Sequence, residues 1–579
     1  MYGANNNDIL DIEELIKNGI NKEFCPFYFQ RNKLQKCEMV FLPYNYIFDH
    51  RFRSALKIDL KASNAVLLID EAHNILNSLE SAKTFELSYK ILEDSVGEIK
   101  NLKTVVEKHE SNSKLSYIEL KEEENILVNI KNYLKKRFQP KTSTWPNIGQ
   151  KLNPEEFFKI FFLGSREDDQ KRIDEGNKIT TDGLTPKNID IHIDRLNRIE
   201  SEFVDLTNKS TILTSFKEFL ELFEILYKNY TENKDDPVKI KSSHIFNYKI
   251  FIHDEDDSND PMKGKSMNSQ SKNRVLSLFC FNPGYAFNEI LETRNNGIII
   301  TSGTLSPIEG LESELKCQFA IKLENKHVID QNQVHFSILP YSPRIKNLTY
   351  SLDSSNRNNV NMQEDLGNTI IELCKITPGG VLVFFTAFHY LKSTINLWQE
   401  KNILNQIEKY KEIFNDTQNA DKNKILLESF RKNSSSKGYR GGILFSVLKG
   451  KCSEGIDFSD DLARLVIVIG IPYANLGDVK VQLKKEYLGE SHNTTFRKIT
   501  PGQWYTEEAT RAVNQALGRV IRHVDDYGVM VLIDQRYIEL NNKKYFSSWL
   551  RQIVKKYGNS DNCEIFSDVS KFFTKMTSI

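Results

Sequence analysis

The chain has 579 residues, and its 78 basic residues equal its 78 acidic residues, so its formal net charge at pH 7 is zero. This balance excludes a uniformly attractive field for polyanions, and a nucleic-acid partner would need a local basic groove. The seven cysteines show no paired spacing, the N-terminus is polar and acidic, and no apolar stretch is long enough to span a bilayer. The sequence therefore predicts a soluble intracellular protein of several domains without a disulfide framework.

The first informative segment is NAVLLIDEAHNI, at residues 64–75. Its apolar run predicts a buried parallel strand, and Asp70 and Glu71 follow at the edge where such sheets bind ligands. We expect Asp70 to hold Mg²⁺, mostly through water, and Glu71 to orient and deprotonate an attacking water. His73 could link this pair to neighbouring motifs. The alternative is a solvated acidic turn at a helix N-terminus.

Between about 85 and 240 the chain is charged and shows helical periodicity. Short β-rich apolar runs flank this stretch, at 66–69, 275–280 and 297–300. The pattern predicts a mainly helical insertion that interrupts an α/β domain.

TSGTLSP (301–307) follows the apolar run at 297–300. The hydroxyls of Thr301, Ser302 and Thr304 are suited to hydrogen-bond the acids and to relay the state of a bound nucleotide to a second lobe. Taken alone, this segment is better explained as a hydroxyl-rich turn that Pro307 ends.

From about residue 335 a second α/β pattern begins, with predicted strands at 380–385, 441–447, 465–470 and 528–534. Helical segments separate these strands, which is typical of a parallel sheet. The predicted fold is α/β, with two nucleotide-handling lobes built on parallel sheets.

Two later segments carry candidate chemistry. In GKCSEGIDFSD (450–460), Gly455 lets the backbone approach a phosphate or ribose, and Asp457 offers a carboxylate; a glycine-containing loop without function explains the segment equally well. In QALGRVIRH (515–523), Gln515, Arg519 and Arg522 fall at i, i+4 and i+7, so the spacing predicts one face of a helix. An arginine that reaches a transferring phosphate contributes roughly 10³ to 10⁵ in rate.

The phosphate loop G-x-x-x-x-G-K-[ST] does not occur in these 579 residues; Gly264-Lys265-Ser266 resembles its end, but Asn259 stands where the first glycine belongs. The chain as written is expected to hydrolyse ATP poorly or not at all. We also expect an unpaired edge or an exposed apolar face beside residues 66–69, and a stable fragment of about 335–579 after limited proteolysis.

Together, five segments resemble motifs II to VI of the xeroderma-pigmentosum-group-D-like helicases of superfamily 2: LLIDEAHNI, IIITSGTLSP, VLVFFTAFHYL, GKCSEGIDFSD and QALGRVIRHVDDYG. Further segments are most similar to the branch of the regulator of telomere elongation helicase: CPFYFQRN, FLPYNYIFD, FCFNPGYAF, LENKHVIDQNQV and RAVNQALGRVIRH. The Fanconi-group J and ChlR-type helicases are close alternatives.

The resemblance implies an ATP- and Mg²⁺-dependent DNA helicase that moves 5′ to 3′ and acts in telomere maintenance or DNA repair in the nucleus. Its partners would be single-stranded and branched DNA, and repair or replication proteins. The residues that match its catalytic and ATP-binding positions are Asp70, Glu71, His73, Gly455, Asp457, Gln515, Arg519 and Arg522. Cys25 matches the fourth ligand of the family's 4Fe–4S cluster.

The resemblance also implies domain boundaries. They are a remnant of the iron–sulfur domain (1–36), an incomplete lobe 1 (37–84 and 266–334), a helical arch insertion (85–265) and lobe 2 (335–579). The phosphate loop, motif Ia and three cluster cysteines are absent together, which a chain that begins late explains better than separate losses. On this reading 579 residues alone would not assemble the cluster. The alternative is a protein without ATPase activity that binds single-stranded DNA or a helicase partner.

Overall fold

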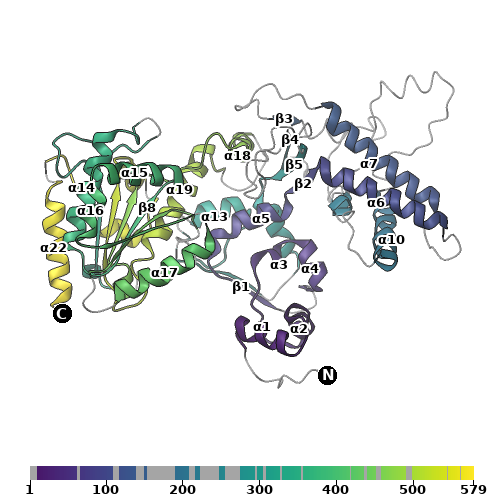
Figure 1. The fold of residues 1–579 in the computed structure, drawn as a ribbon, viewed down its shortest axis with the longest axis horizontal. Coiled ribbons are helices and arrows are strands. Elements are labelled where there is room, and N and C mark those ends of the chain that lie inside the picture. The colour runs from purple at the N-terminus through teal and green to yellow at the C-terminus, as the bar shows by residue number, and fades with distance from the viewer. Residues whose placement is uncertain are drawn as a thin grey trace.

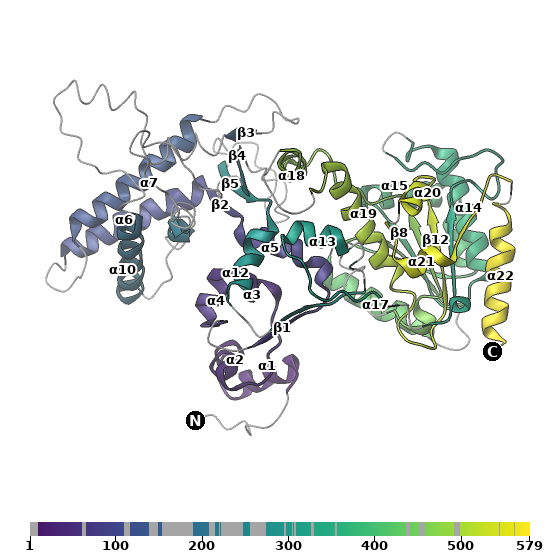
Figure 2. The same cartoon turned by 180° about the vertical axis from the view of Figure 1, so that it is seen from behind.

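The computed structural model describes residues 10–60, 65–108, 116–137, 149–152, 189–207, 215–218, 220–221, 247–254, 274–293, 297–303, 305, 308–325, 329–353, 356–417, 419–435, 440–450, 458–490, 498–543, 545–560 and 562–578. In Figure 1 a large α/β lobe at one end is joined, through a smaller one, to a helical insertion at the other end, and the N-terminal helices project beside the smaller lobe. Figure 2 shows the same arrangement from behind.

The large lobe, called lobe 2 here (residues 334–577), is built on a seven-stranded parallel sheet in the order β13-β7-β12-β11-β8-β10-β9. Its strands are β7 (Val334–Leu339), β8 (Val381–Phe385), β9 (Glu412–Asn415), β10 (Gly442–Val447), β11 (Leu465–Ile469), β12 (Gly528–Ile533) and β13 (Val554–Lys556). Strands β8, β10, β11 and β12 are buried along their whole length. Near-continuous apolar runs are what a parallel sheet covered on both faces requires.

Helices cover both faces of this sheet, and each face has its own core. Along β11, Leu465 and Ile467 point into one core and Val466 and Val468 into the other, as the period of two in a strand dictates. The first core is closed by α14 (Val360–Ile376), α15 (Phe388–Glu400), α16 (Ile403–Glu408) and α22 (Glu564–Thr577). The second is closed by α17 (Ala420–Ser435), α19 (Pro501–Leu517), α20 (Arg536–Asn542) and α21 (Ser548–Ile553).

The smaller lobe, lobe 1, holds a two-stranded parallel sheet formed by β1 (Val66–Ile69) and β6 (Gly297–Ile300). One face of the sheet packs on a core that also contains α3 (Tyr44–Phe48), α5 (Ile75–Lys83), α12 (Pro283–Leu291) and α13 (Ile308–Leu315). The parallel pairing agrees with the sequence, but the prediction that the run before Asp70 is buried is wrong, since Val66 is 56% and Leu68 65% exposed.

The reason is that β6 is the only strand that pairs with β1 in the described residues, and the second face of the pair is left open. Ile299 of β6 lies on this open face and is 51% exposed. The expected exposed apolar face beside residues 66–69 is therefore confirmed.

The insertion combines helices with a small antiparallel sheet in the order β2-β5-β4-β3. Its bounds are β2 (Phe85–Ser88), α6 (Tyr89–Lys108), α7 (Tyr117–Arg137), β3 (Gly149–Leu152), α10 (Ile189–Thr207), β4 (Tyr248–Asp254) and β5 (Arg274–Cys280). The helices pack on one face of the sheet in a single core. Strand β5, which the sequence groups with lobe 1, thus pairs with β2 and β4 and not with β1.

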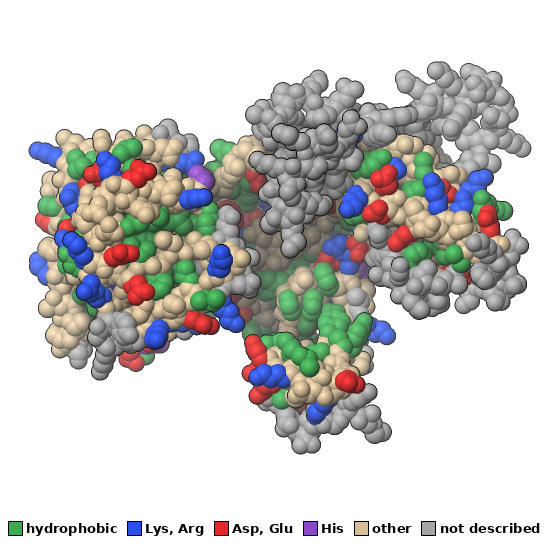
Figure 3. Space-filling view, viewed as in Figure 1, with side chains coloured by type: hydrophobic (Ala, Val, Ile, Leu, Met, Phe, Trp, Pro, Cys, Tyr) green, Lys and Arg blue, Asp and Glu red, His purple; other side chains and the backbone are tan. Residues whose placement is uncertain are grey.

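The N-terminal helices are α1 (Ile12–Asn21), α2 (Pro26–Lys33) and α4 (His50–Leu56). In the space-filling view, hydrophobic side chains gather on the projection that α1 and α2 form (Figure 3). Ile12, Ile16 and Ile20 of α1 recur at helical spacing and are all exposed. None of the helices in the described parts of the chain combines the length and the apolar character that crossing a membrane requires.

Candidate functional site

The two predicted acids lie at the carboxyl end of β1. Because β1 and β6 pair in parallel, the segments that follow them leave the same edge of the sheet. The backbone joins them there: Thr301 N–H donates to Ile69 O at 2.9 Å, and Ala72 N–H donates to Thr301 O at 3.0 Å. Asp70 and Glu71 are both exposed at this edge.

Glu71 has a left-handed backbone, with φ 47° and ψ 40°. This conformation costs a non-glycine residue about 1–2 kcal/mol. The hydrogen bonds of its neighbours hold it, since Ala72 N–H is tied to Thr301 O and Asn74 N–H donates to Glu71 O at 3.1 Å. Strain of this kind gathers at functional sites, where it aims a side chain.

Glu71, His73 and Ser302 form a small hydrogen-bonded group. The Ser302 hydroxyl donates to Glu71 Oε2 at 3.3 Å, and His73 Nδ1 lies 2.9 Å from Ser302 Oγ and 3.2 Å from Glu71 Oε2. The Glu71 side chain is 64% exposed, whereas that of His73 is 9% exposed. The structure thus joins the acidic motif to the hydroxyl motif through Ser302 and His73, as the sequence predicts; Thr304 lies outside the described residues.

Sequence reasoning missed Tyr44, whose hydroxyl donates to the backbone carbonyl of Asp70. Burial and the carboxylates of Glu71 and Asp70 raise the pKa of Tyr44. The signal was present in the segment FLPYNYIFD, but nothing local indicates that this tyrosine meets a strand end 26 residues away.

The prediction that Gln515, Arg519 and Arg522 share one face of a helix is wrong. Helix α19 starts with a capping box at Thr500 and ends at Leu517, and Gly518 is its C-cap. Gly518 keeps a right-handed backbone, with φ −62° and ψ −5°, and it stands at the helix end instead of weakening the helix interior. Gln515 is therefore in the last turn, and both arginines follow in the loop before β12.

The two arginines have different surroundings. Arg519 is buried, at 8% exposed, and its N–H donates to Ala516 O at 3.3 Å. Arg522 is exposed, and its backbone N–H donates to Asp526 Oδ2 at 3.1 Å. In the part of the chain that the structure describes, neither arginine forms an ion pair with Asp70 or Glu71.

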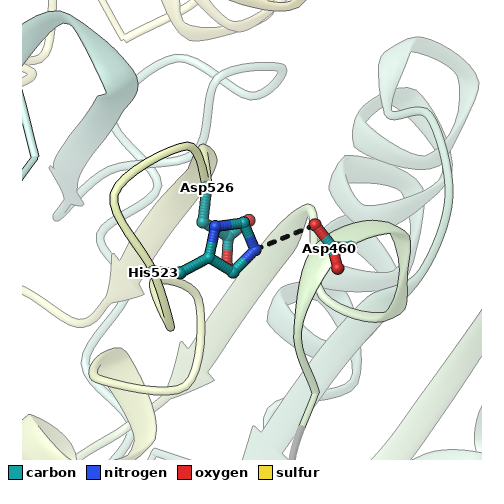
Figure 4. A group of neighbouring side chains, drawn as sticks. All are labelled: Asp460, His523 and Asp526. Atoms are coloured by element: carbon teal, nitrogen blue, oxygen red, sulfur yellow. Dashed lines mark hydrogen bonds and ion pairs between the residues drawn. The ribbon is translucent and has the colours of Figure 1, made fainter.

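Asp460, His523 and Asp526 have ligand atoms within 4.8 Å of one another (Figure 4). His523 Nε2 lies 3.0 Å from Asp460 Oδ1, which joins the end of the 450–460 segment to the arginine segment. Asp526, however, is fully buried and is already neutralised by Arg464, whose Nη1 donates to its Oδ1 at 2.8 Å. A guanidinium at this place opposes a second cation, so the group is better explained as an ion-paired connection than as a metal centre.

Gly455 and Asp457, the candidate residues of the 450–460 segment, lie outside the described residues, as does Cys452. Gly450 is described and closes a turn after β10, with its N–H donating to Val447 O at 3.0 Å.

Cys25 is exposed and is the N-cap of α2. A 4Fe–4S cluster needs four thiolates. Among the described residues the one group of three or more potential metal ligands is Asp460, His523 and Asp526, and it contains no cysteine. Cys280 and Cys374 are buried in the cores of the insertion and lobe 2, and burial raises the pKa of each thiol to about 12. The residues described here do not fit a cluster at Cys25.

Mg²⁺ is a different case. Its small, strongly hydrated ion is usually held through one or two carboxylates together with water and phosphate oxygens. The exposed carboxylate of Asp70, with Glu71 beside it, fits that requirement.

The sequence of this chain is similar to helicase families and to individual helicases. The family model described as "Helicase C-terminal domain" matches residues 370–553, and the DEAD_2 family model matches residues 3–92. The regulator of telomere elongation helicase 1 of Rattus norvegicus is 29% identical over 587 residues, covering 98% of this chain and 44% of that protein. The helicase resemblance is confirmed.

The regulator of telomere elongation helicase 1 homolog of Oryza sativa subsp. japonica is 30% identical over 593 residues, covering 98% of this chain and 55% of that protein. This chain thus spans about half the length of the curated relatives it matches. Among solved structures, one titled "Structure of S. tokodaii Xpd4" superposes with a TM-score of 0.50 at 16% identity, covering 91% of this chain and 84% of that one. That similarity concerns the fold, and it agrees with the α/β architecture predicted from the sequence.

Proposed function

We propose that the chain is the motor body of an ATP-dependent DNA helicase that moves 5′ to 3′ and serves telomere maintenance or DNA repair in the nucleus. The observation that carries the proposal is the hydrogen-bonded group of Glu71, His73 and Ser302 at the shared edge of β1 and β6. The similarity to telomere elongation helicases over 98% of the chain supports the same assignment.

Each candidate residue has a role that follows from its chemistry. Asp70 would hold Mg²⁺ mainly through water, and the ion would neutralise charge on the β- and γ-phosphates of ATP. Glu71 would orient the attacking water and accept its proton, while His73 and Ser302 fix the Glu71 carboxylate. Arg522, exposed beyond the end of α19, is the better placed of the two arginines to meet phosphate charge, because Arg519 is buried.

Nucleotide turnover by residues 1–579 alone is a separate matter. A phosphate loop supplies the backbone N–H groups and the lysine that cradle the phosphates, and no such motif occurs in this sequence. We therefore propose that this chain binds DNA and hydrolyses ATP weakly or not at all.

The test is DNA binding and DNA-stimulated ATP hydrolysis by residues 1–579 and by Glu71→Gln. We expect binding of a single-stranded oligonucleotide that weakens as salt rises, because phosphate contacts release counterions. Any hydrolysis should fall at least 100-fold in Glu71→Gln while DNA binding is unchanged.

Two outcomes contradict parts of the proposal. If no DNA binding is found at low salt, the chain is not the body of a nucleic-acid motor. If ATP is hydrolysed equally well by Glu71→Gln, the acids at the end of β1 are not catalytic. Salt-dependent DNA binding without hydrolysis agrees with the missing phosphate-loop motif. An effect of ATP on that binding distinguishes the proposal from the alternative, a binding protein derived from such a helicase, whose DNA binding ATP does not change.

A further inference from the structure

Helix α18 (Val479–Gly489) of lobe 2 contacts both of the other main parts of the molecule. In both ribbon views it lies between the lobe 2 sheet and the sheet of the insertion (Figures 1 and 2). Its central cation, Lys484, is 3% exposed. A lysine is almost never buried this deeply unless it is paired.

Lys484 has partners from three elements outside lobe 2. Its ammonium forms an ion pair with Glu80 of α5 and lies 3.9 Å from Glu314 Oε2 of α13, both in lobe 1. It also donates to Phe281 O at 3.0 Å, just after β5 of the insertion sheet. One side chain thus joins lobe 2 to lobe 1 and to the base of the insertion.

Arg511 of α19 extends this cluster. Its Nη2 lies 2.9 Å from Glu314 Oε1 and 3.9 Å from Glu507 Oε2. Glu314, whose side chain is 4% exposed, is therefore shared between Arg511 and Lys484, two cations of lobe 2. We call Glu80, Glu314, Lys484 and Arg511 the junction cluster.

Three members of the junction cluster, Glu80, Glu314 and Lys484, are buried. Burial raises the pKa of Glu80 even though Lys484 acts to lower it. Removing one partner from such a site leaves a buried charge without compensation, which is costly.

An apolar contact lies beside the cluster. Leu483 and Tyr487 of α18 pack against Phe251 of β4, Phe279 of β5 and Phe281. Two ion pairs border this contact, Lys249 with Glu490 and Lys151 with Glu486. The attachment of α18 to the insertion therefore has a hydrophobic centre and a charged rim.

From these contacts we propose that α18 is the coupling element of the molecule, a three-way junction through which lobe 1, lobe 2 and the insertion move together. The lobe 1 partners are well placed for this role. Helix α5 begins at Ile75, soon after Asp70 and Glu71, and α13 begins at Ile308, soon after the hydroxyl motif. On the other side, Arg511 is in the helix that leads to Gln515 and Arg519. Any separation of the lobes must break the junction cluster.

Hydrogen exchange of the intact 579-residue chain tests this proposal without ATP or DNA, so its result does not depend on the proposed function. In Lys484→Met, which keeps the length of the side chain and removes its charge, we expect amides of α5 and α13 to exchange at least tenfold faster. Amides of β4 and β5 should also exchange faster, because they lose the same anchor. The amides of β8, β11 and β12 should stay protected, which shows that lobe 2 remains folded.

Lys485→Met is the matched control, since Lys485 is the next residue of the same helix and its ammonium lies over the Tyr505 ring, within lobe 2. Hydrogen exchange in α5, α13, β4 and β5 should equal that of the unchanged protein in this control. If Lys484→Met and Lys485→Met behave alike, or if only α5 responds, α18 is not a three-way junction.

A lobe 1 variant covers the case in which Lys484→Met unfolds lobe 2. Glu80→Lys combined with Lys484→Glu restores opposite charges across the same interface. We expect amides of α5 to exchange more slowly in this double variant than in Glu80→Lys alone. Protection should stay below that of the unchanged protein, because a carboxylate at position 484 cannot donate to Phe281 O and lies beside Glu314. If the double variant is no better protected in α5 than Glu80→Lys alone, the ion-pair part of the proposal is wrong.

Discussion

The two lobes each contain a parallel strand that ends in Ile-Asp, and the two aspartates have opposite surroundings. In lobe 1, β1 leads to Asp70, which is exposed. In lobe 2, β12 leads to Asp534, which is fully buried. The Asp534 carboxylate accepts from Arg536 Nε at 2.9 Å and Nη2 at 2.7 Å, and from Leu352 N–H at 3.0 Å.

Both strand ends thus carry a carboxylate, and the residues packed around each carboxylate determine whether it is exposed or already paired. A carboxylate that already accepts a bidentate arginine has no remaining need for a cation, so Asp534 is a structural residue. Asp70 is exposed, and it is the carboxylate that we propose to meet a ligand. The strands differ in the same way, because β12 is buried throughout and β1 is exposed at Val66 and Leu68.

The largest expected difference in the free energy of unfolding is between a charge introduced into β12 and one introduced into β1. Val531→Asp in β12 should lower the free energy of unfolding of lobe 2 by at least about 4 kcal/mol, because the residue is fully buried and the carboxylate would have no partner. Tryptophan fluorescence during urea unfolding reports it, since Trp398, Trp504 and Trp549 are in lobe 2.

Leu68→Asp in β1 is the matched variant, and it should change the free energy of unfolding by less than about 0.5 kcal/mol because Leu68 is 65% exposed. Limited proteolysis gives a second measure: a fragment of about 335–579 should survive in Leu68→Asp and be degraded in Val531→Asp. Equal sensitivity of the two variants would mean that the open face of β1 is covered.

The second test compares the two aspartates directly. Asp534→Asn should destabilise lobe 2 by about 3 kcal/mol, because the amide cannot accept from both nitrogens of Arg536 and leaves a half-buried guanidinium poorly paired. Asp70→Asn should leave stability within about 0.5 kcal/mol. Thermal unfolding of both variants checks this, and a larger loss for Asp70→Asn would refute the contrast.

The third test uses pH. Burial lowers the pKa of His335, on β7, to about 4, with Asp568 opposing this and Lys555 adding to it. The folded state therefore binds fewer protons than the unfolded state between about pH 6.5 and pH 4, and stability falls as pH falls through that window, by about 2 kcal/mol at pH 5.

His335→Phe should remove this part of the acid sensitivity while leaving the stability at pH 8 little changed, because the ring already packs near Phe572, with centroids 6.2 Å apart. Urea unfolding at pH 5 and pH 8 measures the difference. If both proteins lose the same stability on acidification, His335 is not the group responsible.

The smallest expected effect concerns two serines that donate to carboxylates. In lobe 2, Ser446 Oγ donates to Asp416 Oδ2 at 2.6 Å in a buried position, and Ser446→Ala should cost about 1.5 kcal/mol. In lobe 1, Ser302 donates to the exposed Glu71, and Ser302→Ala should cost less than about 0.5 kcal/mol. Thermal unfolding under one condition distinguishes them; the reverse order would mean that the lobe 1 edge is less open than β1 indicates.

Much of the fold and part of the site could be predicted from local sequence. The runs at 66–69 and 297–300 match β1 and β6, and those at 380–385, 441–447, 465–470 and 528–534 overlap β8, β10, β11 and β12. A short continuous apolar run that is rich in β-branched residues and bounded by turn signals is typical of a buried parallel strand. The contact between the acidic and hydroxyl motifs followed as well, since neighbouring parallel strands place their carboxyl ends together.

Other features depended on partners that are distant in the chain. The spacing of Gln515, Arg519 and Arg522 predicts one helix face, but the helix ends at Leu517, before Gly518. The sequence alone does not say whether a glycine lies inside a helix or at its end. Tyr44 meets Asp70 across 26 residues, and Lys484 meets Glu80 across 404.

The sequence by itself thus determined the α/β class, most of the lobe 2 strands and the helicase resemblance, because these are written in local periodicity and short motifs. The tertiary structure alone decided which strand end stays open, which arginine is buried and which lysine joins the three parts. The exposure of a side chain and its ion pairs depend on the neighbours that folding brings together. Asp70 and Asp534 can therefore follow similar strands while one is exposed and the other is buried.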